Sequence, residues 1–278
     1  MYPLLSPNDL LKINHHPDLI LVDAGNRAFY DQHHLMGAVF VDLNTQLADI
    51  KSNAADGGRH PLPTPQSFVE TVGHLGISSH SHVVVYDDKN ASNAAARLWW
   101  MLRAIGLEKV QVLDGGFQAA EKIGYPIDAQ LVIPKPVAPI PVDDWKLPLS
   151  DISEVERVSH DAVYVIIDVR DSDRYKGLTE PIDTIAGHIP GAVNIPFTGN
   201  LDLEGNFLPA EKLREKYKLV FDKKKPDQII VHCGSGVTAC HTLLAMAAAG
   251  YDIPKLYVGS WSEWSRNNKP MVLKSQTP

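Results

Sequence analysis

The 278-residue chain has only two cysteines, no long apolar run and no excess of basic residues, and each absence excludes a class of protein. Cys233 and Cys240 cannot form the framework of a disulfide-stabilised secreted domain. No apolar run approaches the roughly 18–20 residues of a membrane-spanning helix. Lys and Arg total 26 against 33 Asp and Glu, and the longest basic run, 223–225, is too short for a nucleic-acid surface.

The expected location follows from two further absences. Residues 1–17 lack the positively charged region and the small-residue cleavage site of a secretory signal peptide. Together with the scarcity of cysteine, this favours a reducing, cytoplasmic compartment. A free cysteine in such a compartment is a candidate nucleophile, although most free cysteines are small buried hydrophobic residues.

Proline is concentrated in one stretch, with six residues of this type between Pro126 and Pro148. Neither a helix nor a central strand tolerates that density, so the stretch is predicted to be an extended linker. The sequences on its two sides correspond, for example 82–88 with 228–234. We therefore predict a duplicated domain. Its parts are a first copy over residues 1–126, a proline-rich linker over 127–150 and a second copy over 151–278.

Within each copy, short Val- and Ile-rich runs alternate with helical stretches. Residues 83–85 and 229–231 are typical of buried strands in a parallel sheet. Residues 94–105 and 239–249 each precede a glycine and predict helices. The alternation predicts an α/β fold, with a parallel sheet flanked by helices in each copy. Ligands bind such sheets at the carboxyl ends of the strands, so the loop after Val231 is the candidate site.

That loop contains the segment Cys-Gly-Ser-Gly-Val-Thr over residues 233–238. Gly234 and Gly236 allow successive backbone N–H groups to converge on an anion at the positive end of a helix, which favours a negatively charged sulfur on Cys233. A buried cysteine before a glycine-containing turn is the alternative, and the local pattern fits both. Strand alternation points the neighbouring His232 away from Cys233, which favours a structural histidine. In the first copy Asp87 replaces the cysteine, so only the second copy is expected to react.

Taken together, the motifs resemble the rhodanese superfamily of tandem-domain sulfurtransferases over about residues 4–271. The loop 233–238 is similar to that of the 3-mercaptopyruvate sulfurtransferase branch, whereas thiosulfate-using rhodaneses carry Arg and Lys at the positions of Gly234 and Ser235. Further matching motifs are 58–63, 113–117, 168–170, 187–191, 259–261 and Trp264. An aspartate at the position of Asp87 is usual in the catalytically silent N-terminal copy of this family.

The resemblance implies an activity. A small-molecule donor, with 3-mercaptopyruvate favoured and thiosulfate as the alternative, would pass a sulfane sulfur to Cys233 as a persulfide. A thiol such as thioredoxin or a small thiol, or cyanide, would then accept it. No metal or other cofactor is implied, and the adjacent histidine pairs 15–16 and 33–34 lack the spacing of a metal site.

The resemblance also implies roles for individual residues. The backbone N–H groups that would hold the persulfide belong to Gly234, Ser235, Gly236, Val237 and Thr238. Ser235 and His60 would assist proton transfer at the pyruvoyl leaving group, and Arg174 would bind the donor carboxylate. Because His60 belongs to the first copy, the site is expected at the interface of the two domains. Without the resemblance, Arg174 is better interpreted as a surface cation and His60 as a loop histidine. Arg170 is better interpreted as a buried structural partner of its own loop.

Two departures from the family pattern stand out. The 3-mercaptopyruvate branch usually has a second arginine before the Gly-His-Ile-Pro-Gly motif, but residues 180–186 contain none, and Asn44 stands where an aspartate is frequent.

Two other classes of protein compete with a sulfurtransferase. A cysteine-dependent phosphatase needs an arginine six residues after its nucleophile, where this chain has Ala239. A non-catalytic rhodanese-like binding module would have no need to retain Cys233 together with Gly234 and Gly236.

Overall fold

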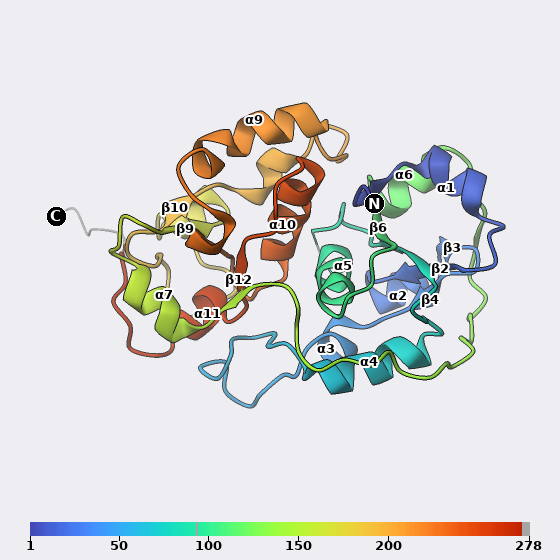
Figure 1. Ribbon diagram of the computed structural model, residues 1–278, viewed down its shortest axis with the longest axis horizontal. Coiled ribbons are helices and arrows are strands. Elements are labelled where there is room, and N and C mark those ends of the chain that lie inside the picture. Colours follow the sequence, from blue (N-terminus) through green and yellow to red (C-terminus); the bar gives the residue numbers. More distant parts are fainter. Residues whose placement is uncertain (93, 274–278) are drawn as a thin grey trace. The chain divides into compact units, whose positions relative to one another are not determined.

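In the computed structural model, which describes residues 1–92 and 94–273, the chain forms two compact units (Figure 1). Unit 1 comprises Met1–Asp49, Leu62–Leu147 and Asp202–Phe207. Unit 2 comprises Ile50–Pro61, Pro148–Leu201 and the chain from Leu208 onward. Each half of the sequence therefore contributes one short segment to the unit that is built mainly from the other half.

Each unit contains a five-stranded parallel sheet. The strand order in unit 1 is β1-β6-β5-β2-β4, and the order in unit 2 is β8-β12-β11-β9-β10. The strands of unit 1 are β1 Leu4–Leu5, β2 Leu19–Asp23, β4 Val39–Phe40, β5 His82–Tyr86 and β6 Val110–Leu113. Those of unit 2 are β8 Leu149–Ser150, β9 Val165–Asp168, β10 Val193–Asn194, β11 Ile229–His232 and β12 Lys255–Tyr257. When the strands of each sheet are counted along the chain, both sheets have the order first, fifth, fourth, second, third. The predicted α/β fold and its duplication are therefore confirmed.

Helices connect these strands. Those of unit 1 are α1 Pro7–Ile13, α2 Arg27–Tyr30, α3 Leu43–Gln46, α4 Pro65–His74, α5 Ala95–Ala104 and α6 Gly116–Lys122. Those of unit 2 are α7 Ile152–Val158, α8 Ser172–Tyr175, α9 Ala210–Phe221, α10 Thr238–Ala248 and α11 Ser260–Trp264, with 3-10 turns η1 Phe197–Asn200 and η2 Pro226–Gln228. A separate antiparallel pair joins β3 His34–Leu35 to β7 Ile127–Asp128. None of the helices in residues 1–92 and 94–273 combines the length and apolar character needed to cross a bilayer.

The proline-rich stretch belongs to unit 1 as far as Leu147. All of residues 129–148 are described, and they contain neither helix nor strand. The amide of Val137 donates to the carbonyl of Gly73 in α4 at 2.9 Å. A Cβ atom at position 73 would lie 2.8 Å from the carbonyl oxygen of Val137, so the glycine allows this close approach.

Helices α5 and α10 are corresponding buried elements of the two units. The predicted helices 94–105 and 239–249 are confirmed to within one residue at each end. Both end at a glycine with positive φ, Gly106 at +95° and Gly250 at +82°. The amide of the following residue bonds back to the helix in each case, from Leu107 to Leu102 and from Tyr251 to Met246 at 3.0 Å. This is the glycine-dependent helix ending in which a left-handed residue satisfies the last carbonyls.

The carboxyl ends of β2 and β9 carry corresponding buried aspartates with different partners. Asp168 at the end of β9 forms a 2.6 Å ion pair with Arg170. In unit 1 the aspartate is Asp23, and Gly25 stands at the position that corresponds to Arg170. The Asp23 carboxylate accepts a 2.8 Å hydrogen bond from the Gly25 amide. Burial raises the pKa of Asp23 to about 6, against a usual value of 3.8. The Asp23 carboxylate is therefore less stable in the folded chain than in the unfolded chain.

We predict that Asp23→Asn stabilises the protein near neutral pH. Because the folded state binds the Asp23 proton more tightly, the free energy of unfolding decreases as the pH rises from about 4 to about 6. A shift of this size corresponds to at most roughly 3 kcal/mol above that window and to little below it. Urea unfolding of the variant and wild type at about pH 4 and pH 7.5 measures the difference.

The matched control is Asp18→Asn, which removes an exposed carboxylate of the same unit. It is expected to unfold like the wild type at both pH values. An Asp23→Asn variant that is no more stable than Asp18→Asn at pH 7.5 would contradict the assignment.

Candidate active site

Cys233 follows β11 directly, at the carboxyl end of the central strand of the unit 2 sheet, and is only 3% exposed. The loop then turns into α10 through Gly236, whose φ is +74°. A Cβ atom at position 236 would lie 2.6 Å from the carbonyl oxygen of Val258. The turn after Cys233 therefore needs glycine for both its conformation and its space.

The first turn of α11 holds the Cys233 loop in place. The amide of Trp261 donates to the Cys233 carbonyl at 3.1 Å, and that of Ser262 donates to the Gly234 carbonyl at 2.9 Å. The Cys233 amide donates to the hydroxyl of Ser260 at 3.2 Å. Ser260 itself has φ +55°, a conformation that non-glycine residues adopt at an energetic cost when the surrounding structure imposes it. The motif 259–261 thus acts by positioning the loop.

The two copies use the corresponding loop differently. In unit 1 the Asp87 carboxylate follows β5 and accepts hydrogen bonds from the amides of Lys89 at 2.8 Å, Ala91 at 2.9 Å and Ala95 at 3.2 Å. The side chain of Asp87 therefore occupies the anion-binding amides of its own loop. In unit 2 the amides of Gly234, Ser235 and Val237 donate to no acceptor within residues 1–92 and 94–273.

A segment from the first half of the sequence completes the site from within unit 2. His60 Nδ1 lies 2.8 Å from the hydroxyl oxygen of Ser235. The segment Ile50–Pro61 is attached to α11 and the residues after it. Its contacts are Gly57 N to Glu263 Oε1 at 3.1 Å, Arg59 N to Ser262 Oγ at 3.0 Å, and Asn267 Nδ2 to the Ala55 carbonyl at 2.7 Å. The predicted association of His60 with the cysteine loop is thus present, although His60 belongs to the same compact unit as Cys233.

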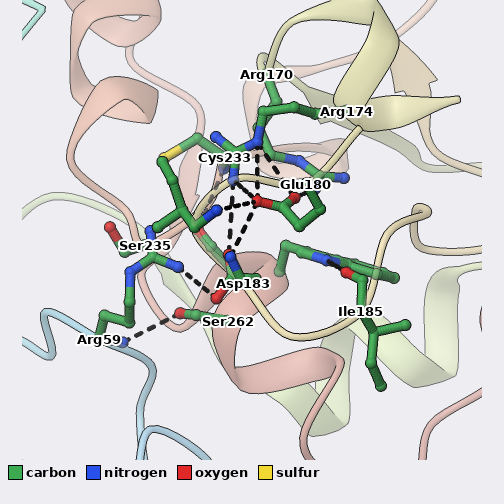
Figure 2. A network of polar contacts seen from close by, with 12 residues as sticks. Arg59, Arg170, Arg174, Glu180, Asp183, Ile185, Cys233, Ser235 and Ser262 are labelled. Carbon is green, nitrogen blue, oxygen red and sulfur yellow. Dashed lines mark hydrogen bonds and ion pairs between the residues drawn. The ribbon is translucent and has the colours of Figure 1, made fainter. Parts of the chain in front are cut away.

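Beside the loop lies a network of buried ion pairs (Figure 2). Glu180, with a side chain 3% exposed, accepts from Arg174 Nη2 at 2.7 Å and from Arg170 Nη1 at 3.3 Å. The fully buried Asp183 side chain pairs with Arg59, with Arg266 at 2.9 Å and with Arg174 at 3.6 Å. Arg174 is therefore a fixed, largely buried cation of the site and not a free surface residue.

Two of these guanidinium groups lie next to the cysteine. A Cβ atom on Gly234 would lie 3.1 Å from Arg59 Nη2 and 3.4 Å from Arg174 Nη2. The sequence reasoning identified Arg174 and missed Arg59, whose only sequence signal is its place before His60 in the motif 58–63. Gly234 leaves the space that both guanidinium groups use, since a larger side chain there would displace them.

Other polar residues near the loop have structural surroundings. Arg170 is 3% exposed and donates to Asp168 and to the Gly187 carbonyl at 2.7 Å, as a buried structural partner of its own loop. His232 is fully buried with Nδ1 3.2 Å from the Cys233 carbonyl, and burial lowers its pKa. The Cys240 thiol, one turn into α10, donates to the Gly236 carbonyl at 3.3 Å. None of these contacts places a second sulfur or a base at the mouth of the loop.

Comparisons with known proteins agree with this architecture. The model of the rhodanese-like domain matches the chain twice, at residues 6–122 and 151–267. A probable 3-mercaptopyruvate sulfurtransferase of Pseudomonas aeruginosa is 36% identical over 94% of each chain. A thiosulfate sulfurtransferase of Mus musculus is 36% identical, covering 90% of this chain and 83% of the relative.

A solved 3-mercaptopyruvate sulfurtransferase of Escherichia coli superimposes with a TM-score of 0.77 at 29% identity, covering 95% of this chain and all of the other. The domain matches, the relatives and the duplicated parallel sheets point the same way. The chain belongs to the rhodanese family and is a tandem-domain sulfurtransferase similar to 3-mercaptopyruvate and thiosulfate sulfurtransferases.

Proposed function

We propose that the protein transfers a sulfane sulfur through a persulfide on Cys233, with 3-mercaptopyruvate as the favoured donor. The observation that carries the proposal is the contrast between the two copies. The loop amides of unit 1 bind the Asp87 carboxylate, whereas the amides of Gly234, Ser235 and Val237 have no acceptor among the described residues. A thiolate or a persulfide on Cys233 supplies the negative charge that such a loop stabilises.

In the first half-reaction the Cys233 thiolate attacks the sulfur of 3-mercaptopyruvate. A sulfur–sulfur bond forms, the carbon–sulfur bond of the donor breaks, and the electron pair passes to the carbon of the pyruvate enolate. The proton that the donor thiol loses ends on that carbon. The hydrogen-bonded pair of Ser235 and His60, 2.8 Å apart, is suited to move it.

In the second half-reaction a thiolate attacks the outer sulfur of the persulfide. The sulfur–sulfur bond breaks, the acceptor leaves as a persulfide, and Cys233 returns to the thiolate. Because Cys233 is only 3% exposed, the acceptor thiol must reach into the loop. A small thiol can do so, and so can a dithiol that protrudes from a protein surface, as in a thioredoxin. A cytoplasmic location, where such thiols stay reduced, agrees with this acceptor class.

Charge balance favours 3-mercaptopyruvate over thiosulfate. Arg59 and Arg174 lie over Gly234 and belong to a network in which four arginines, completed by Arg170 and Arg266, face the three carboxylates of Asp168, Glu180 and Asp183, which leaves one surplus positive charge. Such a site suits the single carboxylate of 3-mercaptopyruvate better than the dianion thiosulfate, because an uncompensated second negative charge is costly in a buried site. Arg174, whose position is fixed by two carboxylates, is proposed to pair with the donor carboxylate.

We predict that Cys233 is the sulfur carrier. After treatment with donor and removal of the excess, one sulfur atom is expected on the peptide that contains Cys233, detected by peptide mass spectrometry. Cys233→Ser is expected to take up no sulfur and to lose transfer activity. Cys240→Ser is the matched control. The serine hydroxyl can still donate to the Gly236 carbonyl, and Cys233 is unchanged, so this variant is expected to take up sulfur like the wild type.

An active Cys233→Ser variant would disprove the mechanism. Sulfur found on Cys240 in the wild type would also contradict it. A wild type that takes up no sulfur from either donor would favour a non-catalytic binding module.

We predict that Arg174 contributes to the preference for the donor 3-mercaptopyruvate. With a small dithiol as acceptor, kcat/KM is expected to be higher for 3-mercaptopyruvate than for thiosulfate. Arg174→Ala is expected to lower kcat/KM for 3-mercaptopyruvate roughly 10- to 150-fold, the range for losing one charge-assisted hydrogen bond. Arg157→Gln, which removes an exposed arginine of α7 in the same unit, is the matched control and is expected to leave kcat/KM unchanged.

Two results would count against this assignment. A higher kcat/KM for thiosulfate would make the protein a thiosulfate sulfurtransferase with the same persulfide mechanism. An Arg174→Ala variant that matches Arg157→Gln would remove Arg174 from the donor site.

A further inference from the structure

The geometry points to Arg59 as a second donor-binding residue, with Asp183 as its positioning residue. This inference rests on the proposed function, because it concerns the same loop and the same donor anion. No arginine occurs in residues 180–186, so the chain segment beside Arg174 supplies no second cation. Arg59 reaches the loop from another part of the sequence.

The position of Arg59 carries the argument. Its Nη2 lies 3.1 Å from the point where a Cβ atom of Gly234 would be, closer than the 3.4 Å of Arg174 Nη2. Residue 234 directly follows the cysteine, so both guanidinium groups stand where the part of the donor remote from its sulfur must lie. Two guanidinium edges that converge on one point form a site for a planar carboxylate or for the oxygens of a sulfonate-like group.

Arg59 is held both by its backbone and by its guanidinium group. Its backbone amide donates to Ser262 Oγ at 3.0 Å, and Ser262 in turn donates its own amide to the Gly234 carbonyl at 2.9 Å. At the other end Nη1 pairs with the fully buried Asp183 carboxylate (Figure 2). The Arg59 side chain is 23% exposed, whereas the side chain of Asp183 is fully buried. A cation fixed in this way loses little conformational entropy when the anion binds.

Asp183 positions the guanidinium groups of both Arg59 and Arg174. It contacts Arg59 and Arg174 with a side chain that is fully buried, and Arg266 neutralises it from a third direction at 2.9 Å. An amide in its place would still accept one hydrogen bond but would not hold two guanidinium groups by charge. Asp183→Asn is therefore expected to weaken donor binding through the two arginines, although Asp183 itself does not contact the donor.

The test separates donor binding from the later step. Arg59→Gln is expected to lower kcat/KM about 10-fold or more for the donor that loads the wild type, mainly through KM, as for the loss of a charge-assisted contact. Arg59→Lys is expected to recover part of the loss, because it keeps the charge without the fork, and Asp183→Asn is expected to raise KM with a smaller effect on kcat. Discharge of the preformed persulfide by a small dithiol, measured in one turnover after loading at high donor concentration, is expected to stay within about twofold of wild type, because the donor anion has left by then.

Arg157→Gln again controls for the change of net charge. The inference is overturned if Arg59→Gln keeps kcat/KM within about twofold of that control. It is also overturned if persulfide discharge slows as much as loading, since Arg59 would then only hold the loop. Failure of the proposed function is a different result, because it appears in the wild type as the absence of sulfur on Cys233.

Discussion

The hydrogen bonds of Ser262 connect the three segments on which the reactive loop depends. Its amide binds the Gly234 carbonyl, and its hydroxyl accepts the Arg59 amide and donates to the Gly259 carbonyl at 2.9 Å. The segments pack so closely that a Cβ atom on Gly58 would lie 2.5 Å from the Gly259 carbonyl oxygen. Ser262, in the middle of α11, thus joins the cysteine loop to the segment that carries Arg59 and His60.

The charged network beside the loop is stable because each buried charge has several partners. Isolated carboxylates as buried as Glu180 and Asp183 would be costly, and an ion pair alone does not always repay the loss of hydration. Glu180 also accepts the amides of Ile182 at 3.1 Å and Asp183 at 3.0 Å, which fixes the turn between the two acids. The arrangement provides rigid cations whose charge is largely balanced. It therefore favours recognition by geometry over a strong general attraction for anions.

Much of the fold was predictable because it follows from local patterns repeated twice. The runs 83–85 and 229–231 consist of Val and Ile, which is typical of buried strands, and the glycines after α5 and α10 mark the ends of those helices. The cysteine and its glycines were indicated by their type and spacing, whereas Arg174 was indicated only by the resemblance to the rhodanese superfamily.

Arg59 was not predictable in this way. It lies in a stretch between α3 and α4 without helix or strand, so no periodicity indicates where its side chain points. Its position is set by Ser262 and Asp183, which are far away in the sequence. The membership of Ile50–Pro61 in unit 2 has the same origin, since hydrogen bonds with Glu263 and Asn267 become visible only in three dimensions.

The exchange of short segments has a consequence for synthesis on the ribosome. The chain passes from one unit to the other at residues 49–50, 61–62, 147–148, 201–202 and 207–208, whereas a simple tandem pair would cross once. Residues 50–61 emerge long before α11, the element to which they bind, has been translated. Domains generally fold in order from the N-terminus as they are made. Here the glycine-containing segment must wait unpaired while about two hundred further residues are added, so assembly of the reactive loop is a late event that requires nearly the whole chain.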